Sequence, residues 1–204
     1  DQDNTAGNLD AIVLDSDVTP ADVTLSRDGD NLVLFINDTG DTLTVNDWFL
    51  NEAGANQVEE IRFADGTLWD ATAIRLMALQ GTSGDDILVG YSSDDVLDGL
   101  TGNDTLIGKT GNDTYIFGRD YGQDTIIDQD NTAGNLDAIV LDSDITPADV
   151  ILRHNGDNLV LSIKDTDDTL TVNDWFLNEA GANQVEEIRF ADGTIWEAAV
   201  IRLM

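Results

Sequence analysis

Five aspartates recur at the sixth position of a nine-residue pattern in the middle of the chain. Residues 81–116 divide into the nonapeptides GTSGDDILV, GYSSDDVLD, GLTGNDTLI and GKTGNDTYI, and a degenerate copy, RDYGQDTII, covers 119–127. Glycine occupies position one in the first four copies and position four in all but the second, while position eight is always apolar or aromatic. The sixth-position residues are Asp86, Asp95, Asp104, Asp113 and Asp124. Carboxylates at so regular an interval favour coordination of a hard cation.

Short strands joined by tight turns are the elements that would position these carboxylates. The stretch around the apolar eighth residue predicts a strand, and the Gly-x-Asp portion predicts a turn. If two nonapeptides complete one coil, aspartates two repeats apart face each other. The expected pairs are Asp86/Asp104, Asp95/Asp113 and Asp104/Asp124, so that Asp104 alone would serve two pairs.

Facing carboxylates repel each other unless a cation lies between them. Calcium suits this arrangement because it accepts about six to eight oxygen ligands in loose geometry, whereas magnesium requires a tighter octahedron. The pattern therefore favours calcium.

The repeats resemble the glycine-rich nonapeptide of the RTX (repeats-in-toxin) family, Gly-Gly-x-Gly-x-Asp-x-U-x, whose parallel β-roll binds Ca²⁺. The resemblance implies that the five sixth-position aspartates are side-chain ligands. It also implies carbonyl ligands from the turn residues Gly81, Ser83, Gly90, Ser92, Gly99, Thr101, Gly102, Gly108, Thr110 and Gly111.

The chain departs from the family pattern at two positions. Thr82, Tyr91, Leu100 and Lys109 replace the second glycine, and Ser93 replaces the fourth-position glycine of the second repeat. We therefore expect the Asp95/Asp113 site to be weaker or strained. A flexible Gly/Asp-rich linker is the alternative interpretation, and four contiguous copies in register disfavour it.

The composition restricts the classes of partner. The chain has 41 acidic residues against 9 Lys and Arg, a formal net charge of −32, and no cysteine. This charge argues against a nucleic-acid partner, because phosphate would be repelled. No run of apolar residues is long enough for a membrane span and no signal peptide is visible.

Two near-identical segments flank the nonapeptides. The sequence DQDNTAGNLDAIVLDSD begins at Asp1 and again at Asp128, and residues 1–77 match 128–204 at 65 of 77 positions. We therefore divide the chain into a first copy (1–80), the nonapeptide segment (81–127) and a second copy (128–204). The second copy stops where the first continues, so we interpret the chain as a piece of a longer array.

Alternating apolar residues predict strands in each copy, and these are joined by turns. In the first copy the strands fall at 10–14, 22–27, 31–36, 41–47 and 58–64, with turns at 27–30 and 64–67 and a short helix at 70–80. The stretches LTVNDWF and VEEIRFADGTLW resemble the linkers that extend or cap the roll in RTX cytolysins and adenylate cyclase toxins.

Other candidate chemistry is sparse. The only histidine, His154, corresponds to Arg27 in the first copy, which disfavours a catalytic base. Exposed tryptophans at matched positions could stack on sugars, but a role in the core is the favoured interpretation; they are Trp48, Trp69, Trp175 and Trp196. Asp47 and Asp174 could ligate a cation, although a turn role is favoured. No phosphate-binding loop or nucleophile elbow is present.

The sequence thus predicts an all-β fold: a calcium-binding parallel β-roll (β-solenoid) flanked by two β-rich modules that extend or cap it. The predicted function is that of a non-enzymatic, secreted or cell-surface calcium-binding module of a larger bacterial protein. The RTX resemblance implies export by a type I secretion apparatus and folding on extracellular calcium. An adhesin or carbohydrate-binding module with a glycan or surface partner, or the non-catalytic part of a secreted hydrolase or epimerase, remains as an alternative.

Overall fold

The computed structural model describes residues 9–50, 57–130, 132, 134–177 and 184–203. The chain divides into two compact units, Asp1–Leu79 and Gln80–Met204. The second unit therefore contains both the nonapeptides and the second copy. The first eight residues of the first copy, where its repeated sequence begins, lie outside the described residues.

The described residues of the first unit form two three-stranded sheets, a 3-10 turn and a short helix. In one sheet β1 pairs in parallel with β5, and β5 pairs antiparallel with β6; in the other, β2, β3 and β4 are antiparallel. Helix α1 begins after Asp70, whose Oδ1 accepts a hydrogen bond from the Ala73 N–H at 2.8 Å. Leu34, Trp48, Ile61 and Ile74 are buried in the core of this unit. The elements are β1 (Ala11–Val13), a 3-10 turn (Pro20–Asp22), β2 (Val23–Asp28), β3 (Asn31–Ile36), β4 (Asp41–Val45), β5 (Glu60–Arg62), β6 (Leu68–Asp70) and α1 (Ala71–Met77).

In the second unit each nonapeptide contributes one short strand. This strand begins directly after the sixth-position aspartate in the first four copies, and at Gln123, one residue before Asp124, in the degenerate copy. Strands pair in parallel with the strand two repeats away, so β7, β9 and β11 join one sheet while β8 and β10 join another. The eighth-position residues point inward and are 0–5% exposed; they are Leu88, Leu97, Leu106, Tyr115 and Ile126. The strands are β7 (Ile87–Val89), β8 (Val96–Asp98), β9 (Thr105–Ile107), β10 (Thr114–Phe117) and β11 (Gln123–Ile127).

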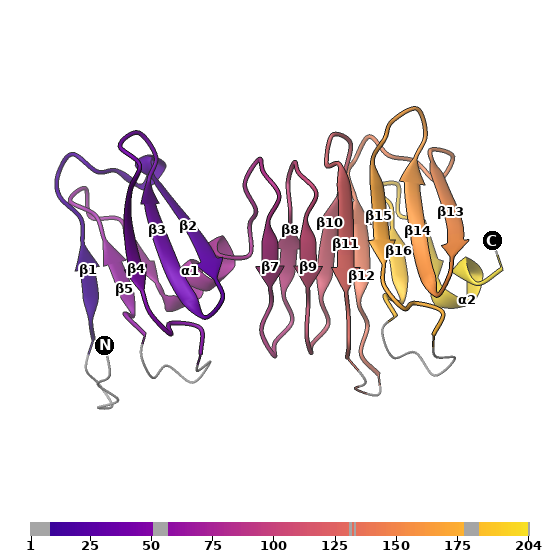
Figure 1. The fold of residues 1–204 in the computed structure, drawn as a ribbon, viewed down its shortest axis with the longest axis horizontal. Helices are drawn as coiled ribbons and strands as arrows, with labels where there is room; N and C mark the ends of the chain where they lie inside the picture. Colours follow the sequence, from indigo (N-terminus) through magenta and orange to yellow (C-terminus); the bar gives the residue numbers. More distant parts are fainter. Residues whose placement is uncertain (1–8, 51–56, 131, 133, 178–183, 204) are drawn as a thin grey trace. The chain divides into compact units, whose positions relative to one another are not determined.

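The second copy adds strands to both of these sheets. β12 pairs in parallel with β10, and β15 pairs in parallel with β11 (Figure 1). The resulting strand orders are β17-β16-β12-β10-β8 and β13-β14-β15-β11-β9-β7. A single apolar cluster extends from Leu88 in the nonapeptides to Ile201 in α2. The added elements are β12 (Ala138–Leu141), β13 (Val150–Asn155), β14 (Asn158–Ile163), β15 (Thr169–Val172), β16 (Glu187–Arg189), β17 (Ile195–Glu197) and α2 (Ala198–Ile201).

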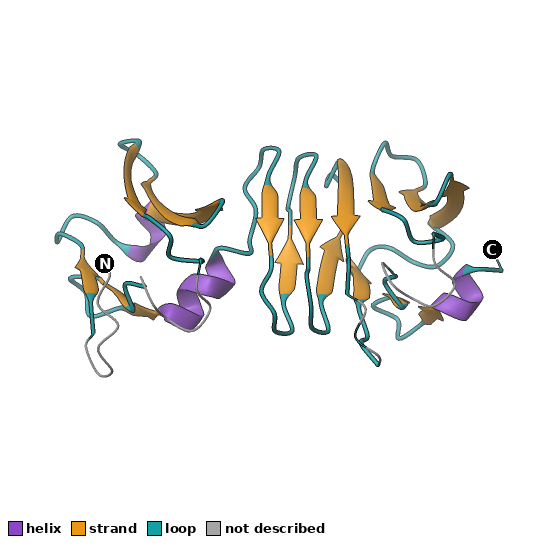
Figure 2. Cartoon of the chain, turned by 60° about the horizontal axis from the view of Figure 1, so that its bottom comes forward, coloured by secondary structure: helices purple, strands orange, loops and turns teal. Residues whose placement is uncertain are grey.

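The described residues are thus mostly strand with few helices, which confirms the all-β prediction at that level (Figure 2). The predicted helix over 70–80 is α1, and the predicted strands of the first copy correspond to β1 to β5. The short strands β6 and β17 were not predicted, because each contributes three residues directly before a helix. Neither α-helix of the described part is long and apolar enough to cross a membrane.

Candidate metal centre: stacked aspartate turns

Each sixth-position aspartate connects its own turn to a neighbouring turn. Asp104 Oδ1 accepts the N–H of Asp86 at 2.8 Å, and Asp113 Oδ1 accepts the N–H of Asp95 at 2.9 Å. Asp124 Oδ1 accepts the N–H of Asp104 at 2.9 Å. The structure therefore brings together the three pairs that the sequence predicts, Asp86/Asp104, Asp95/Asp113 and Asp104/Asp124.

The second carboxylate oxygen turns back toward the start of its own turn. A Cβ on Gly99 would overlap Asp104 Oδ2, and a Cβ on Gly108 would overlap Asp113 Oδ2. Position one of these repeats must therefore be glycine, because the carboxylate six residues into the nonapeptide fills the space of a side chain.

Glycine at position four is required for a different reason. Gly102 and Gly111 have φ angles of 147° and 124°, and a Cβ on them would overlap the carbonyl oxygens of Gly84 and Ser93. Turns in one row therefore stack with main chain against main chain, which only glycine permits.

Position two separates the repeats into two kinds. Leu100 and Lys109 have φ angles of 62° and 77°, the left-handed conformation that suits the glycine of the family pattern. Thr82 does not, and its N–H instead donates to Asp86 Oδ2 at 2.6 Å. Asp104 Oδ2, in the repeat that contains Leu100, is buried without a hydrogen-bond partner. In the Leu100 repeat a left-handed second residue therefore accompanies a buried carboxylate oxygen that is available to a ligand.

Burial makes ionisation of these aspartates unfavourable. Burial, and secondly the neighbouring carboxylates, raise the pKa of Asp113 to about 7, and they raise the pKa of Asp124 to about 7. Burial also raises the pKa of Asp104. At neutral pH the stack must take up protons or cations, and carboxylate oxygens are the donors that calcium prefers.

The second row of turns continues beyond the nonapeptides. Asp137 Oδ1 accepts the N–H of Asp113 at 2.7 Å, and Glu186 Oε2 accepts the N–H of Asp137 at 2.7 Å. The expectation that Asp104 alone lies between two partners is therefore wrong, because Asp113 lies between Asp95 and Asp137. Asp137 and Glu186 were missed by the sequence analysis. The signal was present, since each lies two residues before a buried isoleucine, as in the nonapeptides.

The fifth positions form a second ladder at the surface. Asp85 Oδ1 accepts both the main-chain and the side-chain N–H of Asn103, at 2.8 and 3.1 Å. Asp94 Oδ1 accepts the same two groups of Asn112 at 2.8 and 3.0 Å. The sequence signal is a side-chain oxygen at every fifth position, which is an Asp, Asn or Gln in all five repeats.

The turn residues that the family resemblance implies as carbonyl ligands lie in the same stacked turns. The Gly99 and Gly108 carbonyl oxygens face Gly81 and Gly90 of the adjacent turn. In the described residues no three carboxylate, imidazole or thiolate groups converge closely enough to hold a metal. Paired carboxylates with main-chain carbonyls are therefore the donor set that this geometry offers, and it suits calcium.

Two of the four matched tryptophans are buried in the core, and Trp69 and Trp196 are half-buried. Trp48 and Trp175 are 0% exposed, and their Nε1–H groups donate to the carbonyls of Val58 and Val185, each at 3.0 Å. Neither ring has a face for stacking on a sugar. Asp47 and Asp174 are turn residues with φ angles of 56°.

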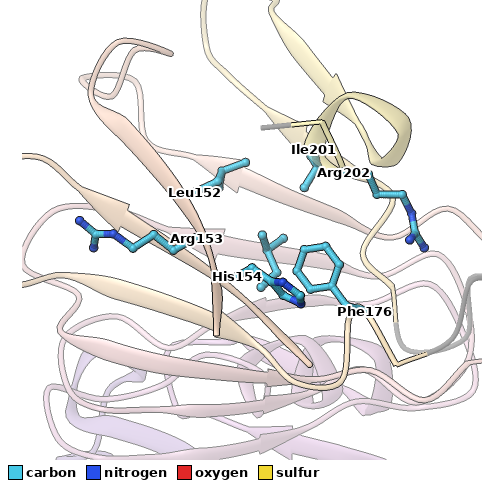
Figure 3. Close-up of a pocket in the computed structure, with 7 residues that line it drawn as sticks. Leu152, Arg153, His154, Phe176, Ile201 and Arg202 are labelled. Carbon is cyan, nitrogen blue, oxygen red and sulfur yellow. The ribbon is translucent and has the colours of Figure 1, made fainter. Parts of the chain in front are cut away.

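His154 lies at a cavity of about 160 Å³ in the second copy (Figure 3). Its ring packs on Phe176 with centroids 3.9 Å apart. The lining consists of Leu152, Arg153, His154, Leu159, Phe176, Ile201 and Arg202. These side chains are apolar or basic, so the cavity lacks the carboxylates of the stacked turns.

Two family descriptions match this chain. The RTX calcium-binding nonapeptide repeat (4 copies) matches residues 80–115, and the haemolysin-type calcium binding protein related domain matches 31–73 and 158–200. The iron-regulated protein FrpA of Neisseria meningitidis serogroup C is 33% identical over 89 residues, which are 43% of this chain and 8% of that protein. The extracellular lipase LipA of Serratia marcescens matches 80% of this chain and 30% of its own, with 16% identity and a TM-score of 0.31.

Proposed function

Because this chain carries the calcium-binding nonapeptide repeats of the RTX family and two related domains, we propose that it is a module whose second unit folds on binding calcium. The observation that carries the proposal is the stacking of buried aspartates whose second oxygens, on Asp104 and Asp124, have no hydrogen-bond partner. The proposed ligands are the five sixth-position aspartates with the carbonyls of their turns.

The chain's own residues would couple binding to folding. Bound calcium would supply the positive charge that offsets the facing carboxylates. The turns can then stack, because glycine at positions one and four admits the carboxylate and the adjacent main chain. Stacked turns place the eighth-position side chains inside, so that binding free energy becomes folding free energy.

The finer architecture and the cellular setting belong to the same proposal. Alternate strands that pair in parallel between two rows of turns support a β-roll that runs from 81 to 127 and continues into the second copy. We place the module outside the cell, exported by a type I apparatus, because the net charge of −32 would oppose folding where calcium is scarce. The catalytic or adhesive activity of the parent protein is not part of this proposal.

Circular dichroism and calcium counting test the proposal. Millimolar calcium should increase the β-structure of the chelator-treated chain, and equal magnesium should not. Asp104→Asn and Asp113→Asn, each between two neighbours, should lose more bound calcium than Asp86→Asn or Asp95→Asn. Asp167→Asn, at an exposed position, is the matched control for charge. Full β-structure in chelator, or equal calcium counts for all five variants, would reject the proposal.

A further inference from the structure

The turn between β11 and β12 differs from every turn within the nonapeptides. It extends from Asp128 to Asp137, ten residues against the six from Gly108 to Asp113. Two acidic side chains near its start, Asp128 and Asp130, are only 2% and 6% exposed. This turn lies outside the stretches that the two families match.

Among the described residues of this turn and of β10 beside it, three polar atoms are buried without a hydrogen-bond partner: Asp128 Oδ2, Asn135 Oδ1 and the Tyr115 hydroxyl. The carboxyl groups of Asp128 and Asp137 lie within hydrogen-bonding reach of each other. Asn135 Nδ2 donates to Asp137 Oδ2 at 2.8 Å, which places the amide beside the same carboxylate. Asp128 and Asn135, each with an unpartnered oxygen, are therefore both neighbours of Asp137.

Tyr115 brings this group next to the nonapeptide stack. Its hydroxyl and Asp113 Oδ2 both lie where a Cβ of Gly108 would be. Its neighbours in the other repeats at position eight are leucine or isoleucine, which carry no polar atom to satisfy. A buried hydroxyl in place of an aliphatic group is costly without a partner. The tyrosine thus adds one more oxygen that a ligand could use.

A cavity lies beside this group. It has a volume of about 170 Å³ and is lined by Gly111, Asn112, Asp130, Thr132, Gly134 and Asn135. Asn135 lines the cavity and also donates to Asp137, so a single side chain lies between the cavity and the buried carboxylate. The volume holds several water molecules at about 30 Å³ each, which is enough for an ion with part of its hydration shell.

We propose that this turn holds a further divalent-cation site, separate from those of the nonapeptides, with Asp128, Asn135 and Asp137 as side-chain ligands. Every side-chain donor is an oxygen, which selects calcium over zinc and other metals that prefer nitrogen or sulfur. The Asn135 amide oxygen adds a neutral donor to the two carboxylates. The choice of calcium for this site rests on the proposed function. Its position rests on residues that are not among the ligands of that proposal.

Ion counting by native mass spectrometry of the full chain in calcium tests the site. Asp128→Asn keeps the shape of the side chain and removes its charge, and it should bind one calcium fewer than the wild type. Asp167→Asn, which removes one exposed carboxylate from the same unit, should bind the wild-type number. Asn135→Ala should lose the same single ion, and it serves as the test if Asp128→Asn does not fold.

The possible results separate the two proposals. An unchanged count and affinity in Asp128→Asn, or in Asn135→Ala where the former does not fold, overturns the further site and leaves nonapeptide binding intact. A wild-type chain that binds no calcium overturns both proposals.

Discussion

The two copies have nearly the same sequence and differ sharply in burial. Leu43 in β4 is 44% exposed, whereas its counterpart Leu170 in β15 is 0% exposed. Asp41 is exposed, whereas its counterpart Asp168 is 6% exposed and accepts the Gly122 N–H at 2.9 Å. Sequence differences do not account for this contrast, because all four residues lie in stretches that are identical between the copies.

The difference comes from the nonapeptide strands. β15 pairs with β11 and β12 pairs with β10, whereas within the first unit β4 pairs only with β3 and β1 only with β5 among the described strands. An identical sequence therefore has a covered edge in one place and an open edge in the other. The nonapeptide stack completes the core of the copy that follows it, so calcium bound to the stack should stabilise that copy.

Removal of calcium should produce the largest difference in stability between the two copies. In chelator we expect loss of hydrogen-exchange protection from β7 to β17, including β14 and β15, because the stacked aspartates repel one another. β3 and β4 of the first copy should change little. Hydrogen exchange with mass spectrometry on the full chain measures both copies at once, with magnesium as the control ion. Equal loss of protection in the two copies would contradict the dependence of the second copy on the stack.

Acid should partly replace calcium in the second unit alone. The pKa of Asp113, Asp124 and Glu186 is about 7 in the folded chain, because burial raises each above its ordinary value near 4. A raised pKa gives stability that is complete below the ordinary value and is lost as pH rises through the folded value. The chelator-treated unit should therefore lose stability between about pH 4 and 7.

Denaturant midpoints taken at several pH values in chelator and in calcium check this. Calcium should remove this dependence of stability on pH, because the carboxylates remain ionised next to the cation. The exposed Asp22 and Asp65 of the first copy have a lowered pKa from hydrogen bonds to Thr19 and Thr67, and these give no loss in this window. A midpoint that rises with pH in chelator would show that the buried aspartates are already compensated.

The structure of the nonapeptide repeats could be predicted from the sequence, but the continuation of their turns into the second copy could not. The sixth-position aspartates and eighth-position core residues were predictable, because each nonapeptide carries its own signal. Asp137 and Glu186 were not predicted. Each lies two residues before an isoleucine, but outside the nine-residue register, and this local signal does not indicate pairing with a partner 24 or 49 residues away. The same reason explains why the burial of Leu170 could not be told from that of Leu43: the two lie in identical sequence.

A matched pair of substitutions measures how much pairing with β11 contributes to the stability of the second copy. Leu170→Ala should cost about 3 kcal/mol, the range for a fully buried leucine that leaves a cavity. Leu43→Ala should cost about 1 kcal/mol or less, because nearly half of the side chain is already in water. Chemical denaturation in calcium, with local protection of β14 and β3 as separate readouts, gives the two values. Similar costs would mean that the edge of β4 is covered as well.

The smallest expected effect concerns the second position of the repeats. Leu100 has a φ angle of 62°, and for an L-residue the left-handed conformation costs about 1–2 kcal/mol. Leu100→Gly should therefore stabilise the calcium-bound second unit, by about 0.5–1 kcal/mol after the entropic cost of glycine. Thr82 lacks the positive φ angle, and its hydroxyl donates to Asp86 Oδ2 at 2.9 Å.

Thr82→Gly should therefore destabilise the same unit, which makes it the matched control. If the stack supports the second copy, the gain from Leu100→Gly should also appear as slower hydrogen exchange in β14 and β15. β3 and β4 should exchange at the wild-type rate. A gain confined to the nonapeptide strands would show that the second copy is stable without them, and that its buried Leu170 reflects contact without energetic coupling.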